Sequence, residues 1–435
     1  MLERKIEKQL HEWKNNANRK CLLVKGARQV GKTFSIDKFC AENYKHYIYI
    51  NFIINEAYIG IFDGALDSRT IIKNLSLMTD TEIVPNETVV FLDEIQECPR
   101  ARTALKFLAI DKPFDVIASG SLLGIRYKEV PSFPVGYVDH LEMHSLDFEE
   151  FCWALGMTKE AMGYIREYFD KGEIVPDAVH IKMMRLFREH IVVGGMPEVV
   201  SKFVDTQNFN TVLETQKNII ADYLDDIAKY ANESDKARAK ECFRAIPRNL
   251  AKEYKKFQYS IVEKGGTARK FKGSLEWLDD AGIISLCYNL SIPELPLKGN
   301  SKSDEFKVYM RDTGLLIAML DEGTQKDIID GNLGIYKGAV YENIIADVLT
   351  KAGKELYYFA VPNLIEIDFF IRRYGYATAV EVKSSDNTKS KSMTNIIGHY
   401  GVKQGIRLSI KNTGASKGDV RYLPLYMAMY LTAGE

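Results

Sequence analysis

One short stretch near the N-terminus has the residue types and spacing of a loop that binds phosphate. GARQVGKT, residues 26–33, fits the pattern G-x-x-x-x-G-K-[ST] and lies between a β-rich apolar run and a helical pattern. Gly26 and Gly31 allow the main chain to curl so that its N–H groups face phosphate oxygens at a helix N-terminus. Lys32 would reach the β- and γ-phosphates, and the Thr33 hydroxyl would coordinate Mg²⁺. The residues expected to contact the nucleotide are Gly26, Ala27, Arg28, Gln29, Val30, Gly31, Lys32, Thr33 and Phe34.

A pair of acidic residues supplies the second part of this predicted site. VVFLDEIQ, residues 89–96, is an apolar strand that ends in Asp93 and Glu94. Strands of an open α/β sheet deliver the residues at their carboxyl ends to the crevice where ligands bind. Asp93 would hold Mg²⁺ through water and Glu94 would orient the attacking water, which favours hydrolysis over binding alone. The alternative is a solvated turn that follows a strand.

Other side chains could complete the chemistry of this site. The strand within residues 116–124 ends near Ser119, whose hydroxyl could contact the γ-phosphate, although small residues are equally typical of a turn. Three arginines are candidates for stabilising transition-state charge, and the sequence does not choose among them or exclude an ordinary surface role. They are Arg100, Arg102 and Arg126.

A second group of charged residues lies near the C-terminus. Glu342 is expected on a helix, Asp368 on a strand, and Glu381 and Lys383 two residues apart on the next strand. Side chains alternate along a strand, so Glu381 and Lys383 share a face that Asp368 could reach across a hairpin. Asp368 and Glu381 would bind a divalent cation, with Lys383 positioning a water or steadying charge on a phosphodiester. Glu366 could serve as a further carboxylate or equally belong to the rim of the strand. The alternative is a sheet edge guarded by ion pairs.

The composition limits the classes of partner. The chain has 435 residues, too many for one core, and 58 basic against 59 acidic side chains. A net charge near zero gives no global attraction to DNA or membrane, so a nucleic-acid site must be a local patch. The six scattered cysteines indicate a reducing compartment and argue against structural zinc. With neither a signal peptide nor a membrane-spanning run, we expect a cytoplasmic protein.

The pattern of apolar residues predicts the elements that position these groups. β-rich runs alternate with helical patterns up to about residue 125, which predicts an α/β fold with a parallel sheet. Residues 206–325 are mostly helical in pattern, and a helix, three strands, a helix and a last strand follow. The expected strands cover residues 21–24, 46–52, 87–93, 114–119, 355–360, 365–371, 376–383 and 406–410, and the last two helices cover 338–352 and 391–403.

Four basic residues in the helical middle precede an apolar stripe. A winged-helix module would have this order, with the basic residues meeting DNA phosphates. A helical connector whose lysines face water is an equal alternative. The residues are Lys264, Arg269, Lys270 and Lys272.

The order of motifs along nearly the whole chain resembles that of prokaryotic AAA-type ATPases with a C-terminal domain of unknown function. The motifs are GARQVGKT, FLDEIQ, SGSLL, FPVGYV, LDFEEF, GGMPEVV, KVYMRDTGLL, GAVYEN, EIDFFI and VEVKSS. The resemblance implies an AAA-type P-loop ATPase domain (residues 1–205), a helical, winged-helix-like domain (206–325) and a PD-(D/E)-x-K nuclease-like domain of restriction-endonuclease-like α/β fold (326–435).

The resemblance also implies roles for residues of the tail. Glu342 matches the helix acid of the nuclease superfamily, Asp368 the strand acid, and Glu381 and Lys383 the E-x-K pair. The chain departs from these patterns at two places. Relatives of the ATPase family commonly have an arginine at the position of Tyr137, and the nuclease superfamily has a proline directly before the strand acid, which is missing before Asp368.

The expected function is ATP hydrolysis with Mg²⁺, coupled to a DNA-facing, nuclease-like C-terminal domain. The alternative is a regulatory or signalling ATPase whose C-terminal domain binds nucleic acid or protein without cleavage. A third hypothesis is a nucleotide-dependent scaffold without turnover. The expected cofactors are ATP and Mg²⁺, and the expected partner is DNA, with a protein partner left open and no membrane.

Overall fold

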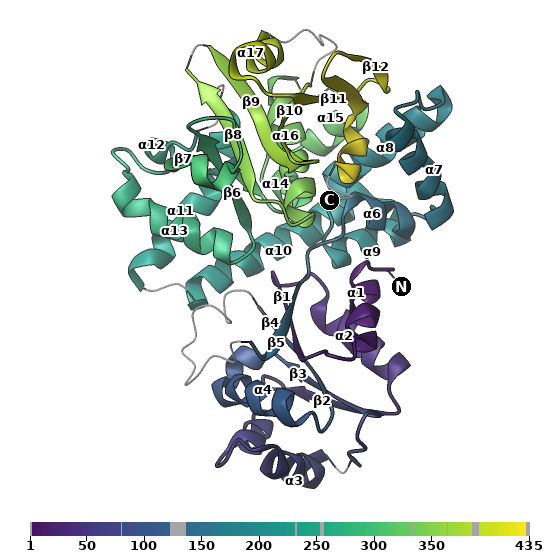
Figure 1. Ribbon diagram of the computed structural model, residues 1–435. Coiled ribbons are helices and arrows are strands. Elements are labelled where there is room, and N and C mark those ends of the chain that lie inside the picture. The colour runs from purple at the N-terminus through teal and green to yellow at the C-terminus, as the bar shows by residue number, and fades with distance from the viewer. Residues whose placement is uncertain are drawn as a thin grey trace. The chain divides into compact units, whose positions relative to one another are not determined.

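The computed structural model describes residues 2–79, 81–121, 136–230, 233–252, 256–332, 334–362, 364–384 and 391–431. The chain forms two compact units, each with its own β-sheet (Figure 1). Glu3–Ser145 and Asp280–Gly282 make up one unit, here called the N-terminal unit. Met1–Leu2, Leu146–Asp279 and Ile283–Glu435 make up the other, here called the C-terminal unit. Among the described residues, no helix has both the length and the apolar composition that crossing a membrane requires.

The N-terminal unit contains a five-stranded parallel sheet, which confirms the expected α/β fold. The strand order is β2-β3-β4-β1-β5. The strands are β1 (Cys21–Gly26), β2 (His46–Asn51), β3 (Thr88–Asp93), β4 (Asp115–Ser121) and β5 (Val138–Glu142). The helices are α1 (Ile6–Asn15), α2 (Lys32–Asn43), η1 (Glu56–Phe62), α3 (Ser68–Thr79), η2 (Ile95–Glu97) and α4 (Pro99–Asp111).

Burial on both faces explains why the first four strands could be predicted and β5 could not. Along β3, Val89 and Phe91 pack in one apolar cluster, whereas Val90 and Leu92 pack in another on the opposite face. A strand covered on both faces is a continuous apolar run. β5 is an edge strand, and its sequence VDHLE carries charge because only part of it is buried.

The first half of the C-terminal unit is helical, as expected. Its helices are α6 (Phe148–Ala154), α7 (Lys159–Lys171), α8 (Asp177–Val193), α9 (Pro197–Thr206), α10 (Phe209–Tyr230), α11 (Glu233–Leu250), α12 (Tyr259–Val262) and α13 (Ala268–Asp280). α13 leads into the antiparallel hairpin of β6 (Ile284–Leu290) and β7 (Ser301–Met310). The winged-helix identity of this region stays a prediction.

The hairpin continues into an eight-stranded mixed sheet of order β12-β13-β11-β10-β9-β8-β6-β7. Its other strands are β8 (Leu356–Val361), β9 (Ile365–Arg373), β10 (Tyr376–Val382), β11 (Gln404–Ser409), β12 (Gly414–Lys417) and β13 (Val420–Pro424). The remaining helices are η3 (Leu297–Asn300), α14 (Thr313–Ala318), α15 (Thr324–Asp330), η4 (Gly334–Tyr336), α16 (Lys337–Lys351), α17 (Lys391–Tyr400) and η5 (Leu425–Tyr430). The sheet therefore takes strands from both sides of residue 325, and the division into domains 1–205, 206–325 and 326–435 stays a prediction.

Helices α16 and α17 pack on opposite faces of this sheet. Phe370 belongs to the apolar cluster that includes Met393 of α17. Its neighbour Phe369 contacts the ring of Tyr309, whose hydroxyl donates to Glu342 of α16 at 3.2 Å. Side chains on the α16 face and on the α17 face can therefore be told apart.

Several of the sequence motifs meet at one tightly packed junction of the C-terminal unit. The Gly195 N–H donates to Asp312 Oδ2 at 2.8 Å, and its carbonyl accepts from the Leu146 N–H at 2.7 Å. Asn343 binds both the N–H and the carbonyl of Met310, at 2.8 and 3.1 Å, as a neighbouring strand would. These motif residues hold helices and strands together, which explains them without a catalytic role.

Gly195→Ala is expected to lower the free energy of unfolding by about 3 kcal/mol or more, because the added Cβ would lie 2.0 Å from the Leu146 carbonyl oxygen, a main-chain atom. Urea or thermal unfolding measures the change. Gly163→Ala is the matched control, since its Cβ would meet open space and alanine favours a helix by about 1 kcal/mol. Equal stability of the two variants would contradict the close contact.

Candidate functional site

The predicted phosphate loop joins β1 to α2 and needs its glycines for two different reasons. Gly31 has φ 90°, in the left-handed region, and immediately precedes Lys32 at the start of α2. Gly26 has little space, because a Cβ there would lie 2.3 Å from the Met143 carbonyl oxygen. The Met143 N–H donates to the Lys25 carbonyl at 2.7 Å and holds this approach. A residue larger than glycine at position 26 would therefore displace the main chain of the loop or of Met143.

The rest of the loop lies around this turn. Gln29 also has a positive φ, of 64°, and the Val30 carbonyl accepts a hydrogen bond from Arg4 at 2.9 Å. Phe34 is largely exposed on the first turn of α2. The predicted contact residues from Gly26 to Phe34 therefore form one continuous loop and helix start, and their roles in binding stay predictions.

Lys32 is buried, and the acidic groups near it do not fully compensate the positive charge of its amino group. Its Nζ donates to the carbonyls of Gly26 and Ala27 at 3.1 and 2.7 Å, and only 7% of the residue is exposed. Burial lowers the pKa of Lys32 to about 8, and the charges of Glu94 and Asp93 offset this only in part. A phosphate in the loop would supply the missing negative charge, so the site fits an anionic ligand.

The carboxylate of Asp93 is the centre of a hydrogen-bond network. Its Oδ2 accepts from the Thr33 hydroxyl at 2.9 Å, and its Oδ1 accepts from the Ser119 hydroxyl. Two residues of β2 that sequence reasoning missed also bind Oδ2: Tyr49 OH at 3.0 Å and Asn51 Nδ2 at 3.0 Å. The strand order places β2, β3 and β4 side by side, which brings their carboxyl ends together. The run HYIYIN hinted at this, because its alternation puts Tyr49 and Asn51 on one face.

The network contains the residue types from which a magnesium site is built. Asp93 is only 1% exposed, and its oxygens lie next to the Thr33 hydroxyl at the end of the phosphate loop. Hydroxyl and carboxylate oxygens are ligands that Mg²⁺ accepts directly or through water. Thr33 and Asp93 are therefore suitably placed, and their roles as metal ligands stay predictions.

Glu94 differs from the preceding Asp93 in its backbone conformation and in its burial. It adopts φ 54° and ψ 44°, which is strained for a residue with a side chain and is often found at functional sites. Its N–H donates to Asp93 Oδ1 at 3.1 Å, and its carboxylate accepts from the Gln96 side chain. The left-handed turn thus separates a buried acid from a half-buried one.

Two of the three candidate arginines have structural contacts. Arg100 donates to the carbonyls of Phe62, at 2.7 Å, and of Gly64. Arg102 is buried, and burial lowers the pKa of its guanidinium. Arg126 lies outside the described residues, so the choice of a charge-stabilising arginine stays open.

In the C-terminal unit, the carboxylates gather around a lysine that the sequence did not single out. Lys307 of β7 is buried, with its Nζ 2.6 Å from Glu366 Oε1 and 3.8 Å from Glu342 Oε2. Burial alone would lower the pKa of Lys307, but the charges of Glu342, Glu366 and Asp368 more than offset it, so the pKa is raised. The only hint in the sequence was a single lysine inside the apolar strand KVYM.

Glu381 and Lys383 form a separate group with Arg407. Glu381 lies 2.8 Å from Lys383 Nζ through Oε1 and accepts from Arg407 Nε at 2.9 Å through Oε2. Ala379, two residues before Glu381, belongs to the apolar cluster under α17, so Glu381 points to the α17 face. Asp368 Oδ2 accepts from the Val382 N–H at 2.8 Å, between Glu381 and Lys383.

The structure therefore divides the four predicted tail residues between two clusters of opposite charges. Glu342 and Asp368 act on Lys307, whereas Glu381 pairs with Lys383 and Arg407. Within the part of the chain that the structure describes, no three or more His, Cys, Asp or Glu side chains are placed to hold a metal ion. The catalytic and metal-binding roles of these residues stay predictions.

Two of the basic residues in the helical middle have acidic neighbours. Lys270 pairs with Glu263, and Lys272 lies 3.3 Å from Asp304. These pairs fit the alternative of a solvated helix face, and contact with DNA stays a prediction.

Three family models match successive parts of the chain. An AAA domain matches residues 18–152, a domain of unknown function (DUF8612) matches residues 184–326, and a second one (DUF4143) matches residues 337–428. No curated protein matches the chain.

Solved structures resemble the chain only weakly. A Walker-type ATPase of Pyrococcus abyssi is 14% identical with a TM-score of 0.45, and the match covers 73% of this chain and 96% of that one. The Orc1 protein of Aeropyrum pernix, solved in complex with DNA, is 13% identical with a TM-score of 0.32, covering 76% and 92%. The RuvB Holliday junction branch migration motor of Thermotoga maritima is 16% identical with a TM-score of 0.32, covering 65% and 89%. The AAA domain match spans the phosphate loop and all five parallel strands, and supports an AAA-type P-loop ATPase domain.

The pKa of Lys32 predicts that nucleotide binding depends on pH. A triphosphate beside the amino group raises its pKa above 8, so the protonated protein is the form that binds. Affinity should be constant below about pH 8 on this account and fall above it by up to about tenfold per pH unit. Titration with a fluorescent ATP analogue at increasing pH measures this.

Lys32→Arg is the matched control for this pH dependence. Its guanidinium stays protonated over the whole range, so the loss of affinity above pH 8 should disappear. A flat profile in the unsubstituted protein would show that Lys32 is not the group that meets the anion.

Proposed function

We propose that the N-terminal unit binds ATP with Mg²⁺ and hydrolyses it. The observation that carries this proposal is the single buried carboxylate of Asp93, hydrogen-bonded to Thr33 of the phosphate loop and to Ser119 of the next strand. The connection joins the loop that would hold the phosphates to the strand ends that would meet the γ-phosphate. The AAA domain match to residues 18–152 supports the same function.

Each residue of the site has a defined part in this proposal. Lys32 and the N–H groups of the loop bind the β- and γ-phosphates. Thr33 and Asp93 hold Mg²⁺, which when bound neutralises charge on those phosphates. Glu94 accepts a hydrogen bond from the attacking water and orients it toward the γ-phosphate.

The bonds to Tyr49 and Asn51 give Asp93 a fixed orientation before nucleotide arrives. Both donate to Oδ2, the oxygen that also accepts from Thr33. An acceptor held by several donors keeps its direction, because rotation would break all of these bonds at once. We therefore assign Tyr49 and Asn51 a positioning role at this site.

Glu94→Gln is expected to reduce phosphate release at least about a hundredfold while leaving ATP binding nearly intact, because the amide cannot act as a base. Malachite green assays of phosphate and a fluorescent ATP analogue measure the two quantities. Glu87→Gln, at a partly exposed glutamate paired with Lys45, is the control and should retain full activity. Hydrolysis that survives in Glu94→Gln would remove the proposed role, and absence of turnover in the unsubstituted protein would favour a scaffold.

For the C-terminal unit, the geometry favours the second of the two expected functions, a domain that binds nucleic acid or protein without cleaving it. Lys307 lies among Glu342, Glu366 and Asp368, and its amino group already pairs with Glu366 and Glu342. Glu381 is balanced by Lys383 and Arg407. A metal-dependent nuclease needs carboxylates that are open toward the metal. On this proposal the ATP cycle regulates a binding domain, and the nuclease-like prediction concerns its fold.

Purified full-length protein is expected to leave supercoiled plasmid intact in Mg²⁺ or Mn²⁺, with and without ATP. The reason is that both predicted metal ligands already have protein partners, because Glu381 pairs with Lys383 and Arg407 and Asp368 accepts from the Val382 N–H. Agarose gels measure nicking over a long incubation. Nicking that disappears in Asp368→Ala but persists in the control Asp304→Ala, an exposed aspartate near Lys272, would establish the nuclease instead.

A further inference from the structure

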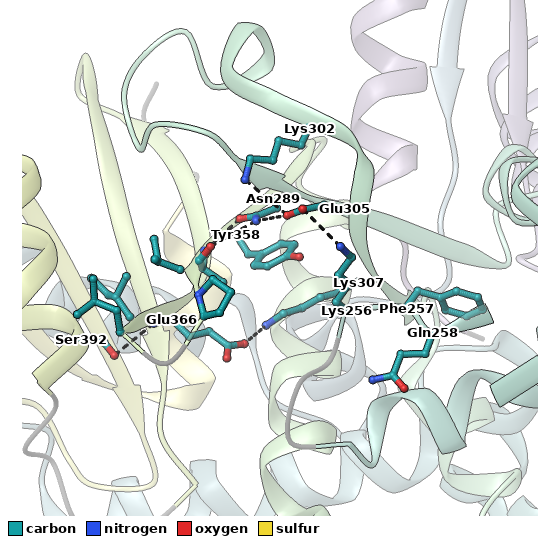
Figure 2. Close-up of a pocket in the computed structure, with 15 residues that line it drawn as sticks. Lys256, Phe257, Gln258, Asn289, Lys302, Glu305, Lys307, Tyr358, Glu366 and Ser392 are labelled. Carbon is teal, nitrogen blue, oxygen red and sulfur yellow. Dashed lines mark hydrogen bonds and ion pairs between the residues drawn. The ribbon is translucent and has the colours of Figure 1, made fainter. Parts of the chain in front are cut away.

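A pocket of about 760 Å³ opens in the C-terminal unit, between the β6–β7 hairpin and the connection from β8 to β9 (Figure 2). Its volume lies in the range of sites for small molecules and cofactors. All of its lining residues lie between Lys256 and Ser392, so none comes from the phosphate loop. The functions proposed above do not use it as a binding site.

Tyr358 supplies an unused hydrogen-bond donor in this pocket. The residue lines the pocket and is only 3% exposed. The Lys307 amino group lies 4.8 Å from the centroid of the Tyr358 ring, and Figure 2 shows this ring between the amino group and Glu305. Among the described residues, its hydroxyl makes no hydrogen bond to the protein, and it is not one of the fully buried polar atoms that lack a partner, so the oxygen keeps some exposure. Burial raises the pKa of Tyr358, so the hydroxyl stays protonated and able to donate.

The rim of the pocket carries an excess of positive charge. Lys256 Nζ lies 3.4 Å and Lys302 Nζ 3.6 Å from the two carboxylate oxygens of Glu305. Asn289 donates to the same carboxylate at 2.7 Å. Two lysines thus share one acid, and both are partly exposed. An anionic group of a ligand would neutralise the remaining positive charge of these two lysines.

The floor of the pocket has the opposite character. Lys307 is matched by both Glu366 and Glu342, and Glu366 keeps 35% of its side chain exposed. Glu366 can therefore accept a hydrogen bond from a ligand N–H in addition to its bond with Lys307. Floor and rim together select a ligand with hydrogen-bond donors at one end and an anion at the other.

The remaining wall is apolar and suits a flat group. It is formed by Val361, Pro362, Leu364 and Ile365, and Leu364 is 62% exposed. An exposed leucine beside a proline offers an apolar surface that a planar ring can cover. A planar ring with N–H donors, joined to an anionic phosphate, is the chemistry of a nucleotide.

We propose that this pocket binds one nucleotide unit, with its phosphate between Lys256 and Lys302 and its base against the apolar wall, within reach of Tyr358 and Glu366. Tyr358 donates to a ring nitrogen or carbonyl of the base, and Glu366 accepts from an exocyclic amine or ring N–H. A free nucleoside monophosphate and one unpaired nucleotide of a nucleic-acid strand present this same chemistry.

The test uses the full-length chain with Lys32→Ala, which removes the ammonium group of the phosphate loop. Isothermal titration with each of the common nucleoside monophosphates should show saturable binding of at least one. Adding Tyr358→Phe, which keeps the ring and loses only the hydroxyl, should weaken binding about fivefold. Adding Lys256→Gln together with Lys302→Gln should weaken it about tenfold or more.

Lys298→Gln is the matched control, because Lys298 is an exposed lysine of the β6–β7 connection that pairs with Glu355 and does not line the pocket. The affinity of this variant for the nucleoside monophosphate should equal that of the Lys32→Ala protein. A parallel titration with a 5′-phosphorylated single-stranded trinucleotide separates the two sources. Tighter binding of the trinucleotide, with the same losses in the variants, identifies a nucleic-acid strand, and tighter binding of the monophosphate identifies a free nucleotide.

Two results would overturn the proposal. One is the absence of binding by every monophosphate and by the trinucleotide. The other is binding that neither Tyr358→Phe nor the double lysine variant weakens, while circular dichroism shows that both variants are folded.

Discussion

The buried carboxylate of Asp93 is the interaction on which the N-terminal unit depends. It joins the phosphate loop through Thr33, the strand β2 through Tyr49 and Asn51, and the strand β4 through Ser119. A carboxylate that is almost fully removed from water requires such donors, because burying a charge is costly unless it is hydrogen-bonded. The same bonds that make its burial possible therefore fix the geometry of the proposed catalytic centre.

Two buried lysines show how differently the two units use charge. Lys32 meets mainly carbonyl oxygens, and burial lowers its pKa to about 8, which leaves it ready for an anionic ligand. Lys307 already has acids around it, and its pKa is raised. A group with an unmet charge is suited to binding, whereas a matched group is suited to holding a fold together. This contrast supports the proposals of ATP binding by the N-terminal unit and of a binding or regulatory role for the C-terminal unit.

Several motifs that characterise the sequence pattern are explained by packing. Gly195, Asp312 and Asn343 belong to three different motifs, and each makes main-chain contacts that hold the junction of helices and strands. A motif residue can be required because another part of the main chain approaches it closely, as at Gly195, without any side chain of the motif taking part in chemistry. The pocket beside β7 combines both kinds of residue, since Lys307 and Glu366 belong to the motifs KVYMRDTGLL and EIDFFI, whereas Tyr358 belongs to none of the quoted motifs.

The sequence by itself determined the parallel α/β sheet, the phosphate loop and the acid pair after β3, because each depends on local spacing along one or two elements. Strands buried on both faces, a glycine-rich turn and a helix start are all visible within about ten consecutive residues. Only the tertiary structure decided that Tyr49 and Asn51 join Asp93, that Lys307 and Arg407 pair with acids of the tail, and that Tyr358 lines a pocket. These residues come from separate strands, and their proximity follows from strand order and from the face to which each side chain points. Local patterns contain neither, because pairing in a sheet brings together residues that are distant in the chain.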